Sequence, residues 1–259
     1  MQSISANLNV MIKAAEKASR ALIRDFGEIE KLQVSIKGPT DFVSNADLKA
    51  EKIIIEELKK AKPNYSIISE EGGIENNKDI KNTWIIDPID GTSNFVRGVP
   101  VWASLIALVY NDVPILGVVS APAMRMRWWA HLGGEAFYNS APIRVSAIDT
   151  LRHASLSITL NKPWRDLDSS GSLEKLQRDV SRVRGYGDFW QHMLVAQGVV
   201  DLAIDSIGLA PYDIAALMPI VQQAGGRCTD RLGTSNWRAN SLVTSNSLLH
   251  DATLAYLPK

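Results

Sequence analysis

Residues 84–95, WIIDPIDGTSNF, combine an apolar run with two carboxylates and two turn-forming residues. The large apolar residues predict a buried strand, and Pro88 and Gly91 predict that it ends in a tight turn after Asp87. Asp87 and Asp90 therefore fall together at one strand end. Like charges held close raise each other's pKa unless a cation neutralises them, so the pair indicates a divalent metal site or an acid–base dyad. A single aspartate would indicate only a turn or a helix cap.

Two further acidic sites have similar surroundings. Glu70 and Glu71 follow a short apolar run and precede two glycines, and Asp213 precedes an apolar helical pattern that ends at Gly225. Each site also has a simpler interpretation, because the two glutamates could be solvated turn charges and Asp213 could be an N-cap.

The ligand types favour a hard cation over zinc. An all-oxygen set without a neighbouring histidine or cysteine suits Mg²⁺. The four histidines show no ligand spacing, and the single cysteine, Cys228, excludes a disulfide framework, a cysteine-based zinc site and an iron–sulfur cluster. The sequence contains no P-loop, no complete dinucleotide-binding glycine motif and no G-x-S-x-G elbow. Residues 87–92 read D-x-x-D-G-T rather than the D-x-D-x-T of haloacid-dehalogenase-type phosphatases, which favours a water nucleophile.

The elements that position these acids follow from hydrophobic periodicity. Apolar residues three or four apart predict helices at 4–23 and 47–61. Short apolar runs predict strands at 66–69, 84–87, 103–110 and 115–121. The second half predicts helices at 190–197 and 213–223, the latter kinked by Pro219, and strands at 154–158, 202–204 and 242–244. This pattern is typical of a mixed α/β fold.

Composition limits the remaining classes. The chain has 259 residues, of which 46% are hydrophobic, and this is enough to bury a core in one large domain or two small lobes. Lys+Arg and Asp+Glu are both 28, so the basic excess typical of nucleic-acid binding is missing. The longest apolar runs are about half of the roughly 20 residues that a bilayer span needs, and no signal peptide is visible. We therefore expect no nucleic-acid or membrane partner and a cytoplasmic location.

The chain resembles the inositol monophosphatase family along nearly its whole length. Residues 87–95, DPIDGTSNF, are similar to the first signature of that family, and 212–216 with 224–226 are similar to the second. Residues 41–47, DFVSNAD, resemble its D-x-V-T-x-x-D segment, and Glu70-Glu71 its acidic pair. Tyr212 departs from the tryptophan that is usual before the ligand aspartate. The resemblance implies a five-layer αβαβα sandwich, here in lobes 1–145 and 146–259, Mg²⁺-dependent phosphomonoester hydrolysis, frequent homodimers and inhibition by lithium.

The resemblance also implies roles for individual residues. Glu70, Asp87 and the Ile89 carbonyl would bind a first Mg²⁺, and Asp87 would bridge to a second ion held by Asp90 and Asp213. A third ion would lie near Glu70. In the same family pattern, the backbone amides of Gly91 and Thr92 lie beside the phosphate, and Asp47 and Thr92 orient and deprotonate the attacking water.

The substrate side resembles the histidinol-phosphate phosphatase branch. Residues 184–190, RGYGDFW, replace the Gly-Ser-Ala or Gly-Thr-Ala typical of inositol monophosphatases. An acid in the alcohol pocket would favour the ammonium of histidinol over uncharged inositol. Asp188 is the first candidate, with a helix N-cap as its alternative role, and Asp205 is the second. Trp190 could stack on the imidazole or belong to the core.

We therefore expect a histidinol-phosphatase, with an inositol-1-monophosphatase as the alternative. Phosphoadenosine phosphate, fructose bisphosphate and a regulatory binding role are further alternatives.

Overall fold

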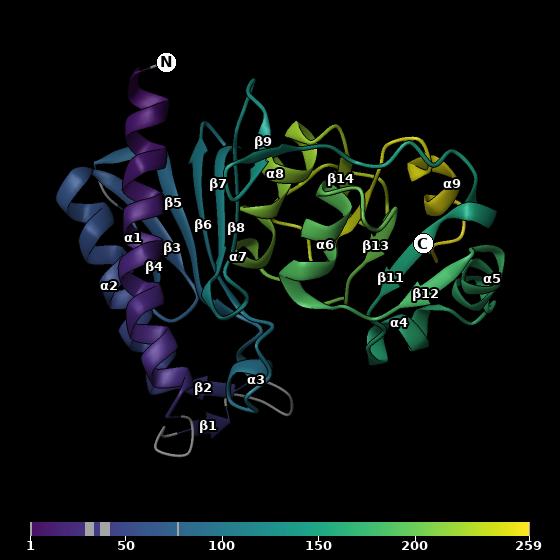
Figure 1. Ribbon diagram of the computed structural model, residues 1–259, viewed down its shortest axis with the longest axis horizontal. Helices are drawn as coiled ribbons and strands as arrows, with labels where there is room; N and C mark the ends of the chain where they lie inside the picture. The colour runs from purple at the N-terminus through teal and green to yellow at the C-terminus, as the bar shows by residue number, and fades with distance from the viewer. Residues whose placement is uncertain (1, 29–33, 37–41, 77, 259) are drawn as a thin grey trace.

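The computed structural model describes residues 2–28, 34–36, 42–76 and 78–258, and it arranges them in five layers (Figure 1). Helices cover an eight-stranded sheet, a second helical layer separates this sheet from a five-stranded sheet, and a third helical layer covers the far side. This αβαβα order is the fold predicted from the sequence.

Two long helices form the first layer, α1 (Gln2–Phe26) and α2 (Asn45–Ala61). In α1 the fully buried side chains Met11, Ala15, Ala18 and Leu22 recur three or four residues apart, which places them on one face. They pack with apolar residues of the larger sheet in a single cluster. Both helices were predicted, with α1 longer than expected.

The eight-stranded sheet has the order β10-β9-β8-β7-β6-β5-β3-β4, and only the β3–β5 pair is parallel. Its strands are β3 (Tyr65–Ser69), β4 (Gly73–Glu75), β5 (Asp79–Asp90), β6 (Ala103–Tyr110), β7 (Val113–Ala121), β8 (Met126–His131), β9 (Ala136–Tyr138) and β10 (Ala141–Ile143). A separate antiparallel pair consists of β1 (Val34–Ile36) and β2 (Phe42–Ser44).

The central strands are buried on both faces, which explains their unbroken apolar sequences. In β5, Trp84 and Ile86 belong to the cluster under α1 and α2, whereas Ile85 belongs to the cluster on the other face. Successive side chains of a strand point to opposite faces, so each strand contributes to two cores.

The middle layer contains α6 (Asp188–Ala196), α7 (Pro211–Ile214) and α8 (Leu217–Gln223). The single helix predicted for 213–223 is wrong, because α7 and α8 are separated at Ala215 and Ala216. Pro219 has no N–H to donate, and its ring excludes the carbonyl of the residue four positions earlier, which is Ala215. The break also packs closely on β7, since a Cβ on Gly117 would lie 2.1 Å from the Ala216 carbonyl oxygen.

The smaller sheet has the order β12-β11-β13-β15-β14. Its strands are β11 (Ser155–Ile158), β12 (Arg182–Arg184), β13 (Leu202–Ile204), β14 (Arg227–Thr229) and β15 (Val243–Ser245). The outer layer contains α4 (Lys162–Leu167), α5 (Ser172–Asp179) and α9 (His250–Leu254). Short 3₁₀ turns at Pro122–Met124 and Leu151–His153 complete the connections.

The larger sheet ends at Ile143 and the smaller one begins at Ser155. The division into two lobes near residue 145 stays a prediction, since helices from the second half of the chain pack directly on the first sheet. Within the residues that the structure describes, no helix has both the length and the apolar character that crossing a bilayer requires.

Candidate metal and substrate site

A cavity of about 180 Å³ opens where β5, α6 and α7 meet the short helix α3 (Thr92–Phe95). Most of its walls are acidic, and several of its residues come from the signature at 84–95. The lining residues are Glu70, Asp87, Ile89, Asp90, Gly91, Thr92, Ser93, Asp188 and Asp213. The folded chain thus brings together acids that are more than 140 positions apart in the sequence.

A bulge in β5 brings Asp87 and Asp90 to the same cavity. The strand does not end after Asp87 as predicted, but continues through a buried Pro88 to Asp90. Asp87 pairs with Leu105 and Asp90 with Ala103, so β5 holds one extra residue between these two points. Residues three apart in a regular strand point to opposite faces, and one extra residue corrects that difference.

Gly91 makes the turn that follows this strand. Its φ of 84° is left-handed, and a Cβ there would lie 2.9 Å from the Val101 carbonyl oxygen. The conformation and the space both require glycine. The turn thereby places Thr92 directly beside the acids.

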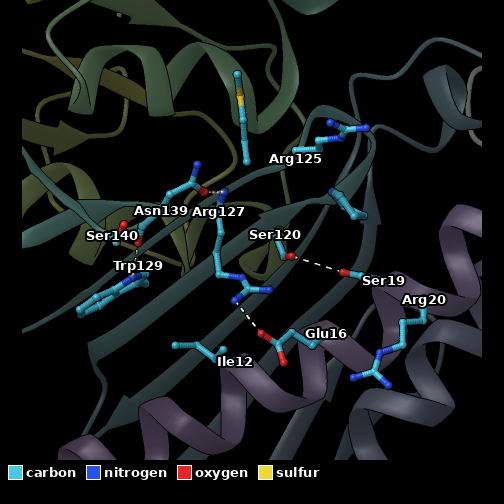
Figure 2. A pocket seen from close by; sticks show the side chains of 12 residues that line it. Ile12, Glu16, Ser19, Arg20, Ser120, Arg125, Arg127, Trp129, Asn139 and Ser140 are labelled. Atoms are coloured by element: carbon cyan, nitrogen blue, oxygen red, sulfur yellow. Dashed lines mark hydrogen bonds and ion pairs between the residues drawn. The ribbon is translucent and has the colours of Figure 1, made fainter.

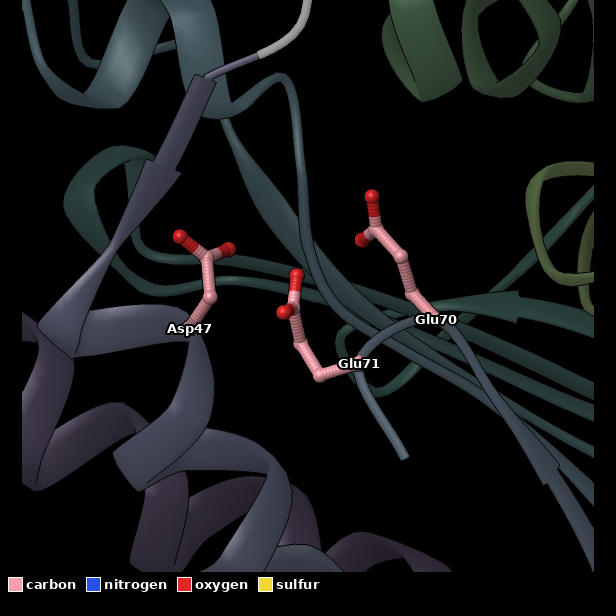
Figure 3. Close-up of side chains that lie close together, drawn as sticks. All are labelled: Asp47, Glu70 and Glu71. Carbon is pink, nitrogen blue, oxygen red and sulfur yellow. The ribbon is translucent and has the colours of Figure 1, made fainter. Parts of the chain in front are cut away.

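Two groups of carboxylates could each hold a cation. The oxygens of Asp87, Asp90 and Asp213 lie within 4.8 Å of one another, and so do those of Asp47, Glu70 and Glu71. Figure 3 shows the second group, in which Asp47 from α2 faces the two glutamates that follow β3. The two groups meet at the cavity through Glu70 and Asp87.

The electrostatics of the first group fit a bound cation. Burial raises the pKa of Asp87 well above its ordinary value, and the charges of Glu70, Asp90, Asp213 and Asp47 raise it further. Removal from water and the nearby Asp188 and Asp213 also raise the pKa of Asp90. Among the described residues, Asp87 Oδ1 is buried without a hydrogen-bond partner. An all-oxygen set with a buried, unpartnered carboxylate oxygen suits a hard divalent ion.

Backbone amides fix two of these carboxylates. The Phe189 N–H donates to Asp90 Oδ2 at 2.7 Å, and the Ala210 N–H donates to Asp213 Oδ2 at 2.7 Å. Asp213 therefore lies in the first turn of α7, whose N-cap is Ala210, so the sequence interpretation of Asp213 as N-cap is wrong. These contacts hold one oxygen of each carboxylate in place.

Thr92 connects the end of β5 to the acidic group that contains Asp47. Its Oγ1 lies 2.8 Å from the Ile89 carbonyl oxygen and 3.4 Å from Asp47 Oδ1. Asp47 is only 1% exposed and lies in the first turn of α2. Asp41, the first residue of the matching segment, falls outside the described residues.

Asp188 lines the cavity and does not cap its helix. The N-cap of α6 is Gly187, and Asp188 itself has a φ of 47°. The Asn94 side-chain amide donates to Asp188 Oδ2 at 2.8 Å. Burial, reinforced by the charge of Asp205, raises the pKa of Asp188 to about 6. The alternative role as helix cap is therefore wrong, because Asp90 accepts from the first free amide of α6.

The two other substrate candidates lie outside the cavity lining. Asp205 accepts hydrogen bonds from His192 Nε2 at 3.0 Å and Thr159 Oγ1 at 2.8 Å. Burial raises its pKa, but the bonds and charge from His192 outweigh this and bring it below the ordinary value. The Trp190 ring packs edge-on against Tyr186, with ring centroids 5.3 Å apart.

Sequence reasoning missed Glu51, which supports the Glu70–Glu71 turn. Its Oε2 accepts from the Glu71 N–H at 2.9 Å, and a Cβ on Gly72 would lie 2.8 Å from its Oε1. Burial raises the pKa of Glu51, although hydrogen bonds from Glu71 and Ser69 oppose this effect. The available signal was its spacing, since Glu51 follows Asp47 by one helical turn on the same face of α2.

Comparisons with known proteins identify the family of the chain. The chain is 39% identical to an inositol-1-monophosphatase of Mesorhizobium japonicum over 98% of this chain and 97% of that protein. It is 40% identical to a histidinol-phosphatase of Mycobacterium tuberculosis, covering 97% of each. The crystal structure of extragenic suppressor protein suhB from Bartonella henselae superimposes with a TM-score of 0.92 at 36% identity, covering 98% of this chain and 99% of that one. Because the sequence profile of the inositol monophosphatase family also matches residues 4–259, the chain belongs to this family of metal-dependent phosphatases.

Proposed function

We propose that this chain hydrolyses phosphate monoesters of small alcohols with bound Mg²⁺, and that histidinol phosphate is its substrate. The observation that carries the reaction type is the pair of carboxylate groups that meet at one small cavity through Glu70 and Asp87. A site with this much negative charge binds a phosphate only after cations have neutralised it. Family membership supports the same reaction.

The second of the proposed ligand sets is one of the two carboxylate groups, and the first combines Glu70 of one group with Asp87 of the other. Glu70, Asp87 and the Ile89 carbonyl would hold one Mg²⁺, and Asp87, Asp90 and Asp213 would hold a second, with a third near Glu70. When bound, the ions neutralise the phosphate charge and lower the pKa of a water molecule. The buried Asp87 oxygen without a hydrogen-bond partner supports its bridging role.

The chain's own groups would orient and deprotonate the water. Thr92 Oγ1 lies within reach of two acceptors, the Ile89 carbonyl and Asp47, so its single proton can be donated to only one of them at a time, and its lone pairs are free to accept from a water. In this proposal Thr92 orients the water and Asp47 receives the proton through it. Glu70 holds the water on the opposite side. The amides of Gly91 and Thr92, at the start of α3, would donate to phosphate oxygens.

The proposed substrate rests on Asp188. Its carboxylate lines the cavity and is fixed by Asn94, and in this proposal it faces the alcohol part of a bound ester. That charge favours the ammonium of histidinol over uncharged inositol. Asp205 lies outside the cavity lining, but its charge acts on Asp188 and in this proposal adds to the preference for a cation. The imidazole would meet the aromatic face of Trp190 by extending beyond the cavity lining.

The second candidate substrate is inositol monophosphate. Relatives of closely similar identity carry either name, so the comparisons favour neither substrate. The acid at position 188 is the observation that places histidinol phosphate first.

The test measures phosphate release from L-histidinol phosphate and from inositol 1-phosphate, each with Mg²⁺. We expect the wild type to prefer histidinol phosphate. Loss of one charge-assisted contact in Asp188→Asn should lower kcat/KM for that substrate by about tenfold or more, because such bonds contribute about 1.5–3 kcal/mol. The inositol reaction should stay within about twofold of wild type.

Asp166→Asn is the matched control, because it removes an equal charge from an exposed residue of α4 that pairs with Lys162. A wild type that prefers inositol 1-phosphate, with no effect of Asp188→Asn on selectivity, would reject the substrate assignment and leave the metal chemistry intact.

We also propose that the enzyme is a cytoplasmic homodimer. The single cysteine, which is buried in β14, is compatible with a reducing compartment. Light scattering after size-exclusion chromatography measures the oligomeric state, and the mass of a monomer, 28.5 kDa, would contradict the dimer.

A further inference from the structure

A second cavity of about 580 Å³ lies between α1 and the strands β7 and β8 (Figure 2). It shares no lining residue with the acidic cavity. Its volume lies within the range of about 300–1,000 Å³ that is typical of small-molecule sites. The function proposed above makes no use of it.

The charged residues of this cavity are mostly basic. Three arginines reach it from different elements, namely Arg20 from α1, Arg125 from the turn before β8 and Arg127 from β8. The only acid in its lining is Glu16, whose Oε1 lies 3.0 Å from Arg127 Nη1. In the described part of the chain, the guanidinium groups of Arg20 and Arg125 form no ion pair or hydrogen bond. The lining therefore carries an excess of two positive charges.

One donor in this cavity wall is buried without a partner. The side chain of Arg127 is 27% exposed, but its Nε is inaccessible to solvent and has no hydrogen-bond acceptor among the described residues. Because this N–H is closed to solvent, a molecule in the cavity would contact the outer Nη groups of Arg127 instead. Figure 2 shows the Arg127 side chain extending from β8 toward Glu16 on α1.

Neutral polar groups and an apolar wall complete the lining. The Ser19 and Ser120 hydroxyls face each other at 3.4 Å from opposite walls. The Trp129 indole is held in place, because it stacks on Phe137 at 4.1 Å between centroids and donates to the Asn139 carbonyl at 3.2 Å. Fixed aromatic surface beside several donors is typical of a site for an amphipathic small molecule.

From these observations we propose that this cavity binds a small organic phosphate, with its dianionic phosphoryl group on the arginines and its apolar or planar part against Trp129. Guanidinium groups bind phosphate oxygens through parallel N–H donors, and the two excess positive charges of the lining match a dianion. A single carboxylate would neutralise only half of that excess. The volume fits a small molecule rather than a macromolecular segment.

The test uses phenylphosphonate, a dianion with a flat ring and a P–C bond that a phosphomonoesterase does not hydrolyse. Calorimetry is done with the full chain in the presence of a chelator, because the metal-free acidic cavity repels anions. We expect saturable binding of one molecule per chain to the wild type. In the double variant Arg20→Gln/Arg125→Gln, each lost charge-assisted bond weakens binding by about tenfold. Benzyl alcohol, which lacks the charge, should not bind.

The matched control is Arg24→Gln, which removes one charge from an exposed arginine of α1 that does not line the cavity. It should bind phenylphosphonate as the wild type does. Arg20 and Arg125 are exposed, so their replacement leaves the core intact, and thermal unfolding checks this. The proposal is overturned if the wild type shows no saturable binding, if the double variant binds equally well, or if Arg24→Gln weakens binding to the same extent.

Discussion

Replacing Asp87 with asparagine keeps the size of the side chain and removes one negative charge from the acidic cavity. Its oxygens and those of Asp90 and Asp213 lie within 4.8 Å of one another. At such a separation, two unit charges repel by about 3.5 kcal/mol for an effective dielectric of about 20. The wild type relieves part of this repulsion by protonation, since the pKa of Asp87 is raised. We therefore expect metal-free Asp87→Asn to be more stable than the wild type by about 1–2 kcal/mol at pH 8.

Mg²⁺ should reverse this order of stability. A ligand at one hundred times its Kd stabilises the folded state by about 2.7 kcal/mol, and the variant should lose most of that gain. Loss of a bridging ligand should also remove several kcal/mol of transition-state stabilisation, which corresponds to a kcat about a thousandfold lower.

Urea unfolding with and without Mg²⁺, together with phosphate release, measures both effects. Asp166→Asn serves as the charge control, because it lies on the exposed surface of α4. The assignment of Asp87 as a metal ligand whose charge is unbalanced without the ion would be refuted by either of two results. One is a metal-free variant that is less stable than the wild type, and the other is a variant that keeps wild-type turnover with Mg²⁺.

Three further predictions concern the surroundings of the site. Glu51→Gln should lower Mg²⁺ affinity by about tenfold or more in calorimetry, because Glu51 accepts the Glu71 N–H and so holds the acidic turn in place. The control Glu56→Gln, on the exposed side of α2, should leave the affinity unchanged. Equal affinities of the two variants would show that Glu51 does not support the site. Burial and the charge of Arg227 lower the pKa of His250 in the folded chain from 6.5 to about 4. On acidification the unfolded chain therefore binds the proton first, so the contribution of neutral His250 to stability is fully present only above pH 6.5. Lowering the pH to about 4 should remove roughly 3 kcal/mol, and His250→Gln should flatten this slope in urea unfolding; an identical slope would contradict the buried neutral histidine. Gly117→Ala should destabilise the fold by about 3 kcal/mol or more, since its Cβ would meet the Ala216 carbonyl oxygen. The control Gly27→Ala, whose nearest contact would be at 3.5 Å, should not destabilise it. Similar melting temperatures of the two variants would show that the segment before α8 can shift to accommodate the added Cβ.

The local pattern was enough to predict the central elements of the fold. Helices α1 and α2 and strands β3, β6 and β7 appear within a few residues of their predicted positions, because each buries a regular apolar face or run. Strand β8, which forms a wall of the second cavity, was not predicted. Its sequence, MRWWAH, mixes basic and apolar residues. Which of them face the second cavity depends on how the sheet packs against α1, and the local sequence does not show that packing.

The sequence motifs identified most of the acids, but not how they are held. The bulge in β5 depends on pairing with β6, and the cap that Asp90 provides to α6 joins residues 99 positions apart. Neither contact leaves a local signal, so the sequence predicted the turn directly after Asp87 and offered a helix cap as the alternative role of Asp188. The support that Glu51 gives to the Glu70–Glu71 turn is also long-range.

The measurement that tests the central claim most directly is phosphate release from L-histidinol phosphate and inositol 1-phosphate while Mg²⁺ is added back to chelator-treated protein. The account predicts no turnover without metal and a saturable recovery that Asp87→Asn and Asp213→Asn both fail to show. Full turnover by the metal-free protein, or full recovery in either variant, would contradict it.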